Sequence, residues 1–441
     1  MVVDRSGRGH CIASLVAADG HDVHYIPGCP DPNNPQLRTA THISLVDTVG
    51  VTEYARANQI DIAFVTNVAA LSAGVVDALR QGGIAAVGPV AAASRLENSK
   101  VFAKSLFAKY RIPSPEYRSF SDAAEASAFV NKHRDFSVIK ADGLCGGNGA
   151  FVCDSVLQAE QAIRRVMVDR VFGASGDRVV VERRHFGQEL SFFAVLDRGG
   201  WRVLPMAIDY PRTDDGNRGP ISGGMGALSH HPSDTPDTVS RIERELLAPV
   251  RELIEGEGLD YTGFIYLGVM VSEGRPLLLE INVRMGEPET EVILPRLGTS
   301  VTDLLMATLD GRVAYASLRI TEEHFCDVVA VQGSALAIGD GRLLPGWPIG
   351  SLPVGQPVTG YLDIDRRQCL GYLGEARVDS TGQLVSDGGR VIHVVGRGPD
   401  RETASRRAYD QIRRIHFAGI RFRHDIGTVM PWDDLSTGKP L

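Results

Sequence analysis

The sequence lacks several features that mark large classes of proteins. No run of apolar residues reaches the ~18 that a membrane-spanning helix needs, and the start of the chain lacks the basic-then-apolar pattern of a secretory signal peptide. The six cysteines form no CxxC pair and no tight cluster, which is typical of reduced thiols rather than of a disulfide framework. These absences predict a cytoplasmic protein that does not bind a membrane.

Motifs for several kinds of active site are absent as well. The sequence contains no GxxxxGK[ST] phosphate loop, no helix-opening GxGxxG for dinucleotides, no HExxH for zinc and no GxSxG for a nucleophilic serine. The net charge of −8 argues against a general nucleic-acid binder. We therefore expect small-molecule ligands and no nucleic-acid partner.

The composition is that of a folded protein with many tight loops. The chain has 441 residues, 43% of them hydrophobic, which is enough for two or three domains with buried cores. Its 48 glycines are about 11% of the 441 residues, which exceeds the ~7% that is average for proteins. Lysine is rare, because only six of the 46 basic residues are lysines, at positions 100, 104, 109, 132, 140 and 439.

Hydrophobic periodicity divides the chain into a first part, in which short strands alternate with helices, and a second part that is rich in strands. In the first 95 residues, short β-branched runs at 60–65 and 84–89 flank a helical pattern at 73–80, which predicts a parallel α/β sheet. Further on we expect helices at 99–110, 156–168, 236–256 and 402–415, and strands at 137–140, 150–152, 178–182, 187–196, 201–208, 264–271 and 276–282. The Gly- and Pro-rich stretch 211–232 is expected to be a long polar loop.

Two of the rare lysines stand beside features that suit a bound phosphate. Lys100 opens a helix, with Lys104 one turn later, and Lys140 ends a strand just before the glycine-rich turn 143–149. Glycines let backbone N–H groups close over phosphate oxygens, and ammonium groups offer point charges to them. Taken singly, a solvated strand-end lysine and an ordinary hairpin explain these positions equally well.

Acidic residues at strand ends form a second set. Glu182 leaves a strand where it can face an adenine amino group, and Glu189 can accept hydrogen bonds from ribose hydroxyls, although each alone is more typical of a surface carboxylate. Alternation with period two places Glu280, Asn282 and Arg284 on one strand face, opposite the apolar positions 279, 281 and 283. Glu and Asn oxygens two residues apart suit Mg²⁺, and the arginine could reach a transferring phosphoryl group.

Taken in order, these segments resemble the ATP-grasp ligases, and among them the phosphoribosylamine–glycine ligase (glycinamide ribonucleotide synthetase) family. The similarity covers essentially the whole chain. The matching strings are GP at 88–89, RLENSK at 95–100, IKADGL at 139–144, GP at 219–220, GGMGA at 223–227, YTGF at 261–264, EINVRMGEPET at 280–290, GGRV at 388–391 and DIG at 425–427.

The resemblance implies an α/β protein with the ATP-grasp fold in three domains. An N-terminal parallel α/β domain, the pre-ATP-grasp domain, would span residues 1–95. The ATP-grasp domain would span 96–315 and include a lid subdomain at about 115–190. A small β-rich α+β domain would span 316–441.

The resemblance also implies an ATP- and Mg²⁺-dependent carboxylate–amine ligase. A small carboxylate, which is glycine in the family, attacks the γ-phosphate to give an acyl phosphate, and ADP leaves. An amine then attacks the acyl carbon, which forms an amide bond and releases phosphate. The family further suggests a role related to purine biosynthesis and a monomer or homodimer.

Individual roles carry over from the family to matching positions. Arg284 and Lys140 would be catalytic, and Glu280 and Asn282 would bind Mg²⁺. The ATP site would consist of Lys100, Lys140, Gly146, Gly147, Gly149, Glu182, His185 and Glu189. The carboxylate and amine substrates would lie against Arg8, Asp209, Arg212, Gly223, Gly224, Met225, Glu287 and Glu289.

Departures from the family concentrate on the acceptor side. The family's Gly-Gly-Arg-Glu-His reads SGRGH at 6–10, Val68 stands where a Gly-Pro-Glu loop has its carboxylate, Ile221 replaces an asparagine, and Asn148 replaces a lid lysine. We therefore expect an acceptor amine other than phosphoribosylamine. Two alternatives stay open, a genuine phosphoribosylamine–glycine ligase of purine synthesis and a nucleotide-binding pseudoenzyme.

Overall fold

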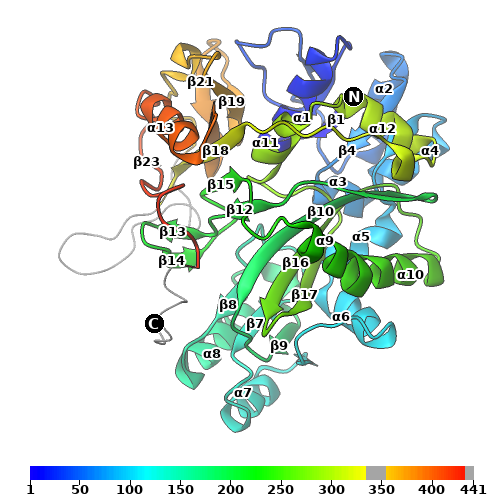
Figure 1. Cartoon of the computed structure of the whole chain (residues 1–441), viewed down its shortest axis with the longest axis vertical. Coiled ribbons are helices and arrows are strands. Elements are labelled where there is room, and N and C mark those ends of the chain that lie inside the picture. The colour runs from blue at the N-terminus through cyan, green and yellow to red at the C-terminus, as the bar shows by residue number, and fades with distance from the viewer. Residues whose placement is uncertain (334–353, 433–441) are drawn as a thin grey trace.

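The computed structural model describes residues 1–333 and 354–432 (Figure 1). The parts of the predicted C-terminal domain at 334–353 and 433–441, with Lys439, lie outside the described residues. Within the described part, no helix combines the length and apolar content needed to cross a membrane.

The N-terminal region is built on a parallel sheet, as its alternating pattern predicts. Its strands lie in the order β3-β2-β1-β4-β5 and pair in parallel. They are β1 (Val2–Asp4), β2 (His24–Pro27), β3 (Arg38–Thr39), β4 (Ile62–Val65) and β5 (Ala85–Val87). The accompanying helices are α1 (Gly7–Ala18), α2 (Thr48–Ala57), α3 (Val68–Ala73), α4 (Val75–Gln81) and α5 (Ala91–Asn98). The apolar strands are buried, as expected for a parallel sheet that helices cover.

A small antiparallel sheet follows, in the order β6-β9-β7-β8. Its strands are β6 (Tyr117–Phe120), β7 (Val138–Ala141), β8 (Ala150–Val152) and β9 (Val179–Glu182), and its helices are α7 (Ala123–Lys132) and α8 (Val156–Ile163). The unit has a hydrophobic core of its own, which includes Ile139, Ile163 and Val181. Figure 1 shows it below the rest of the molecule, joined to it through α6 (Lys100–Lys109) and β10 (Gln188–Asp197).

A 10-stranded sheet connects the middle of the chain with its C-terminal part. Its main path runs β17-β16-β10-β12-β15-β18-β22-β19, with β11 added beside β10 and β23 beside β18. The remaining strands of this sheet are β11 (Gly200–Val203), β12 (Ala207–Asp209), β15 (Gly226–Ser229), β16 (Gly263–Ser272), β17 (Arg275–Asn282), β18 (His324–Gln332), β19 (Cys369–Leu373), β22 (Arg390–Gly398) and β23 (Ile420–Arg421). The sheet therefore continues across the domain boundary predicted at 315.

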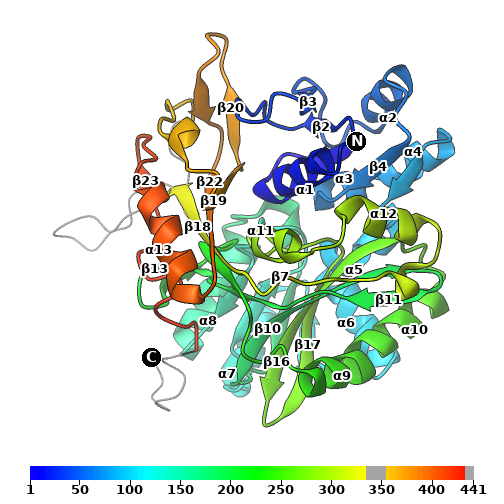
Figure 2. The same ribbon diagram turned by 45° about the horizontal axis from the view of Figure 1, so that its top comes forward.

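Helices pack on both the central and the C-terminal strands. α9 (Pro236–Ile242) and α10 (Ala248–Gly256) lie along β16 and β17 (Figures 1 and 2), where Val250 and Leu253 share a core with Leu267. α11 (Thr290–Ile293) and α12 (Val301–Leu309) pack against α1, and α13 (Arg401–Ile412) covers β18 and β22. The expected combination of a parallel N-terminal sheet, a mixed central part and a β-rich C-terminal part is confirmed.

The prediction of a long polar loop at 211–232 is wrong. The segment contains β13 (Arg212–Asp214), β14 (Arg218–Ile221) and β15. β13 and β14 form a hairpin, whereas β15 pairs with β12 on one side and with β18 on the other. These strands are only three or four residues long, which is too short to show an alternating pattern among the surrounding glycines and prolines. Two further short strands, β20 (Ala376–Val378) and β21 (Leu384–Ser386), form a separate pair.

A β-bulge in β17 shifts one leucine away from its predicted face. Leu278 pairs with Val269 and Glu280 with Gly268, so the ladder skips Leu279. Leu278 is 0% exposed in the core, whereas Leu279 is half-buried. The predicted alternation is therefore wrong at this position.

The bulge predicts unequal losses of stability when two neighbouring leucines are each replaced by alanine. Leu278→Ala should destabilise the protein by about 2–5 kcal/mol, because it leaves a cavity in a closely packed core. Leu279→Ala removes the same atoms from a half-buried site and is the matched control, with a clearly smaller loss. Urea unfolding of both variants measures the difference, and equal losses would contradict the bulge.

Candidate active site

A buried glutamate at the end of β9 holds two lysines. Oε1 of Glu182 lies 2.8 Å from Nζ of Lys104 in α6, and Oε2 lies 3.0 Å from Nζ of Lys140 in β7. Burial alone would raise the pKa of the Glu182 carboxyl, but the two ammonium groups lower it below its ordinary value. Burial lowers the pKa of Lys140, yet Glu182 and Glu280 raise it overall. Lys140 is therefore held as a cation, and the carboxylate expected to face adenine is already occupied by ammonium groups.

The glycine-rich turn lies against Gly223, one of the residues expected to hold substrate. The backbone N–H of Lys100 donates to the carbonyl of Asp142 at 3.0 Å, which joins the start of α6 to the start of the turn. Gly146 and Gly147 have φ angles of 59° and 83°, in the left-handed region that favours glycine. A Cβ on Gly147 would lie 2.8 Å from Cα of Gly223. Only a glycine allows the turn to approach this closely.

Glu280 and Asn282 lie together on β17 and fit the donor set of a hard cation. Nδ2 of Asn282 donates to Oε1 of Glu280 at 3.2 Å. Burial would raise the pKa of Glu280, but Lys140 and Lys100 lower it, so that the carboxylate is ionised. The Glu280 carboxylate and the side-chain oxygen of Asn282, which accepts from Arg284, are the hard oxygen ligands that Mg²⁺ prefers.

Arg284 is held at the end of β17 by a residue that the sequence did not single out. Its Nη2 donates to Oε1 of Glu97 at 2.7 Å and to Oδ1 of Asn282 at 3.1 Å. The second oxygen of Glu97 accepts the backbone N–H of Val283 at 2.9 Å. Glu97, at the end of α5, therefore fixes both the strand end and the guanidinium.

The carboxyl groups of Asp209 and Glu289 form an acidic group beside Gly224. A Cβ on this glycine would lie 3.0 Å from Oδ1 of Asp209, which is buried and has no hydrogen-bond partner among the described residues. Glu289 accepts a hydrogen bond from Oγ of Ser191 at 3.1 Å. Burial and the neighbouring Glu289 raise the pKa of Asp209 well above its ordinary value. An ammonium group placed beside these carboxyls would favour their ionised form.

The backbone N–H groups at 224 and 225, expected to hold substrate, are already paired. The N–H of Gly224 donates to Oγ of Ser222 at 3.3 Å, and that of Met225 donates to the carbonyl of Tyr210 at 2.9 Å. The Met225 side chain is buried with Val329. These two N–H groups are therefore paired within the protein, and their contact with substrate stays a prediction. A Cβ on Gly224 would lie 2.4 Å from Cδ of Pro288, so the backbone here is closely packed.

Glu287 makes protein contacts instead of facing open space. The backbone N–H of Gly7 donates to its Oε1 at 3.0 Å, and Nη2 of Arg390 lies 3.4 Å from its Oε2. Arg390 also donates to the carbonyl of Glu287 at 2.8 Å and to the carbonyl of Gly223. Burial would raise the pKa of Glu287, but Arg390 and His393 lower it well below its ordinary value. This charged pair connects residues 287–289, the substrate segment, with β22.

Arg8, expected at the substrate, is buried between Asp4 and Glu287, whose Oε2 lies 3.9 Å from its Nη1. Its Nε and Nη2 donate to Oδ2 of Asp4 at 3.1 and 2.9 Å, and the other oxygen of Asp4 accepts the backbone N–H of Arg5 at 2.7 Å. A Cβ on Gly9 would lie 2.4 Å from Cβ of Asp4. Asp4 therefore fills the space that a side chain at position 9 would need.

Other predicted residues lie at the margin of the cluster. His185 is partly exposed between β9 and β10, and Glu189 is exposed at the start of β10. Arg212 opens β13 and donates to the carbonyl of Gly219 at 2.8 Å. Gly149 packs against Cys145, since a Cβ there would lie 2.8 Å from Sγ.

The sequence interpretation gave no role to Glu97 or Arg390, although both lie in strings that match the family. Glu97 contacts Arg284 across 187 residues of chain, and Arg390 contacts Gly223 across 167. No periodicity or spacing rule spans such separations. Only the family strings mark these two positions.

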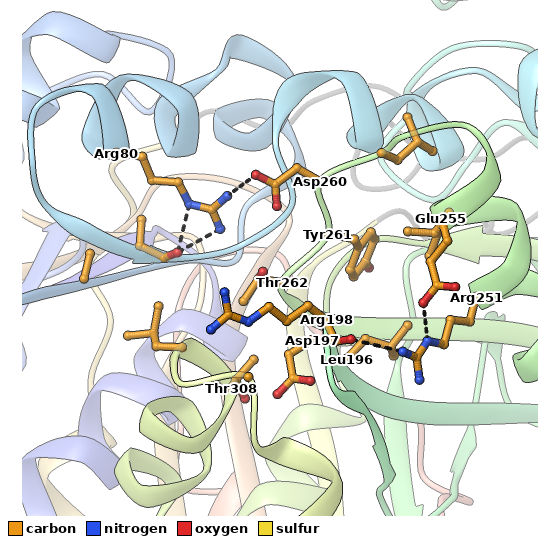
Figure 3. Close-up of a pocket in the computed structure, with 16 residues that line it drawn as sticks. Arg80, Leu196, Asp197, Arg198, Arg251, Glu255, Asp260, Tyr261, Thr262 and Thr308 are labelled. Carbon is orange, nitrogen blue, oxygen red and sulfur yellow. Dashed lines mark hydrogen bonds and ion pairs between the residues drawn. The ribbon is translucent and has the colours of Figure 1, made fainter.

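A separate cavity of about 480 Å³ lies away from this cluster (Figure 3). Arg198 and Thr308 line it, and Arg80 pairs there with Asp260 at 2.9 Å. None of the predicted site residues is among its lining residues. This cavity is therefore not the site predicted from the sequence.

Comparison with known families assigns three successive parts of the chain. Models of phosphoribosylglycinamide synthetase match residues 1–97 (N domain), 98–290 (ATP-grasp (A) domain) and 345–429 (C domain). The chain belongs to the phosphoribosylglycinamide synthetase family. It is accordingly an ATP-grasp ligase that forms carbon–nitrogen bonds, as the resemblance predicts.

Relatives of this phosphoribosylglycinamide synthetase family match along the whole chain. The phosphoribosylamine–glycine ligase of Caldanaerobacter subterraneus subsp. tengcongensis is 33% identical over 428 residues, covering 97% of this chain and 98% of its own. That of Ralstonia nicotianae is 35% identical over 432 residues, covering 97% and 98%. These comparisons give no support to the altered acceptor expected from the departures, nor to a pseudoenzyme.

Solved structures agree with the family assignment. The crystal structure of phosphoribosylamine–glycine ligase from Thermotoga maritima superposes with a TM-score of 0.78 at 30% identity, covering 96% of this chain and 99% of that one. The biotin carboxylase domain of Hydrogenobacter thermophilus 2-oxoglutarate carboxylase has a TM-score of 0.68 at 14% identity, covering 96% and 90%. The second likeness shows the ATP-grasp fold alone.

Glu97→Ala should lower kcat/KM by about 10–100-fold. The change frees the Arg284 guanidinium and leaves a buried N–H unpaired, and a lost hydrogen bond to a charged group costs about 1.5–3 kcal/mol. Rates of ADP release measure the effect. Glu53→Ala, on an exposed face of α2, is the control; a Glu97 variant as active as this control would show that Arg284 needs no such support.

Glu182→Gln should destabilise the protein at neutral pH by about 3–5 kcal/mol, because it leaves two buried ammonium groups without their carboxylate. The folded state lowers the pKa of Glu182 below its ordinary 4.5, so its stabilisation is present above pH 4.5 and is lost as the pH falls below that value. Urea unfolding at a series of pH values measures the difference between variant and parent. A difference that does not shrink below pH 4.5 would contradict the ion pair.

Proposed function

We propose that this ligase joins glycine to phosphoribosylamine in an ATP- and Mg²⁺-dependent reaction that passes through an acyl phosphate. The convergence of Lys140, Glu280, Asn282 and Arg284 beside the glycine-rich turn carries the proposal. The names of relatives that cover 97% of the chain support the choice of substrates.

The nucleotide would lie between the small sheet and β17. Lys140, held cationic by Glu182, and Lys100 at the start of α6 would neutralise the phosphates. The turn with Gly146, Gly147 and Gly149 would close over them. The backbone at 182–185, with His185, would contact adenine, and Glu189 would accept hydrogen bonds from the ribose.

Glu280 and Asn282 would hold Mg²⁺ through their side-chain oxygens. Their donor set fits in kind, because the Glu280 carboxylate is ionised and Asn282 carries an amide oxygen, which accepts from Arg284 at 3.1 Å. When bound, the ion neutralises phosphate charge and orients the γ-phosphate for in-line transfer.

The chain's own residues would position the two organic substrates. Asp209 and Glu289 form an acidic spot that suits an ammonium group such as that of glycine. Arg284, fixed by Glu97, would offset charge on the transferring phosphoryl group. Gly223 and Gly224 leave room for the acceptor, with Arg212 on β13 nearby. Most of the rate would come from positioning and charge neutralisation, as is general for phosphoryl transfer.

The function is tested by ADP release from ATP and Mg²⁺ with glycine and freshly generated phosphoribosylamine, with mass-spectrometric detection of the amide product. We expect turnover that requires both substrates. Turnover with glycine and a different amine, but not with phosphoribosylamine, would instead favour an altered acceptor. Binding of MgATP without turnover on any pair would favour a pseudoenzyme.

Glu280→Gln should lower Mg²⁺-dependent turnover by about 100-fold while the protein stays folded. The amide keeps the size of the side chain but removes the charge that attracts the cation. Glu273→Gln, at the exposed turn between β16 and β17, is the matched control and should behave as the parent. Full activity of the Glu280 variant would show that the metal is held elsewhere.

A further inference from the structure

A histidine surrounded by carboxylates lies buried where three regions meet. His393 comes from β22, Asp327 from β18, Glu287 from the segment before α11, and Glu291 from α11 itself. His393, Asp327 and Glu291 are 0% exposed. Gly7, at the start of α1, covers the group from the N-terminal side, since a Cβ there would lie 2.6 Å from Nε2 of His393 and 2.8 Å from Oε1 of Glu291.

The hydrogen bonds of this group leave several ligand atoms unused. Nδ1 of His393 is 2.7 Å from Oδ2 of Asp327, which orients the ring. Its Nε2 has no hydrogen-bond partner among the described residues and lies 3.4 Å from Oε1 of Glu287. Neither carboxylate oxygen of Glu291 has a hydrogen-bond partner in the same part of the chain, although the side chain is fully buried.

We propose that Glu287, Glu291 and His393 bind a transition-metal dication of the Zn²⁺ or Mn²⁺ class, at a site separate from the candidate Mg²⁺ site. One ligand atom from each of the three residues lies within 4.8 Å of the other two. Oε1 of Glu291 lies 3.8 Å from Nδ1 of His393, beyond hydrogen-bond distance. A dication would supply this buried carboxylate with a direct partner and use the free Nε2. The proposal does not depend on which amine the ligase uses.

The geometry and chemistry of the donors narrow the class of metal. Zn–N and Zn–O bonds of about 2.0–2.2 Å place neighbouring tetrahedral ligands roughly 3.4 Å apart, and Nε2 of His393 lies 3.4 Å from Oε1 of Glu287. Imidazole with carboxylates suits Zn²⁺ or Mn²⁺, whereas Mg²⁺ and Ca²⁺ prefer oxygen ligands alone. Asp327 on Nδ1 completes the carboxylate–histidine–metal arrangement that fixes the ring of a ligating histidine.

A metal here would connect the substrate segment with the rest of the molecule. Glu287 also accepts the N–H of Gly7, and Arg390 bridges Glu287 and the carbonyl of Gly223. The ion would therefore join the segment before α11, α11 itself and β22, with α1 attached through the N–H of Gly7. Its role would be to position the substrate segment rather than to contact the reacting atoms.

The test measures metal bound to the full-length protein after removal of metals with a chelator and titration with ZnCl₂ or MnCl₂. Glu291→Gln and His393→Gln should each lose one equivalent of bound metal, or weaken its Kd at least ~100-fold. Asp327→Asn should weaken the Kd by about 10–100-fold, as expected for a residue that only orients a ligand. Circular dichroism checks that each variant is folded.

Two controls separate this site from others. His10→Gln alters a second buried histidine, which lies 3.3 Å from Asp31, and should keep the full equivalent. Glu280→Gln should keep it as well, because it affects only the candidate Mg²⁺ site. Co²⁺ bound to the parent should show visible bands that Glu291→Gln loses. Absence of tight metal binding in the parent, or full retention in folded Glu291→Gln and His393→Gln variants, would overturn the proposal.

Discussion

The ion pairs of Glu182 with Lys104 and Lys140 are the interaction on which the candidate site depends. They join α6, β7 and β9, and Lys140 also donates to the carbonyl of Leu279 on β17 at 3.4 Å. The ion-paired Lys140 thus connects the four-stranded sheet to the 10-stranded sheet. Because these side chains are almost fully buried, removing any one of them leaves an unpaired charge. The same contacts that hold the two sheets together also hold a cation where phosphate would lie.

Contacts to a second buried glutamate, Glu287, organise the part of the cluster near Gly223. Arg390, from the C-terminal region, reaches both Glu287 and the carbonyl of Gly223. Gly7 from the N-terminal helix donates to the same glutamate. The surroundings of the substrate segment are therefore assembled from three parts of the chain.

Sequence alone predicted much of this arrangement, and its errors have physical causes. Runs such as 62–65 and 179–182 are short, apolar and β-branched, and they formed strands as predicted. Leu279 was misplaced because a bulge depends on pairing with β16, which periodicity within one strand does not contain. Strand β15 was missed because partners on both sides stabilise it.

Among the candidate site residues, those carried by a rigid strand were the most predictable. Glu280, Asn282 and Arg284 do lie within hydrogen-bond reach along one side of β17. The ion pair of Arg8 with Asp4, four residues earlier, was not predicted, and a substrate role for Arg8 stays a prediction. Glu97 and Arg390 act through contacts across more than 160 residues of chain, which only the fold brings together.

The central position of β15 limits how the chain can be shortened. β15 is bordered by β12 and by β18, so its backbone groups are paired on both sides. A fragment that ends before β18 would expose one side of β15 as an open edge, and such edges recruit strands from other molecules. The C-terminal region is therefore more than an appendage to the catalytic part: it shields the protein from self-association, and truncated versions are expected to aggregate when expressed.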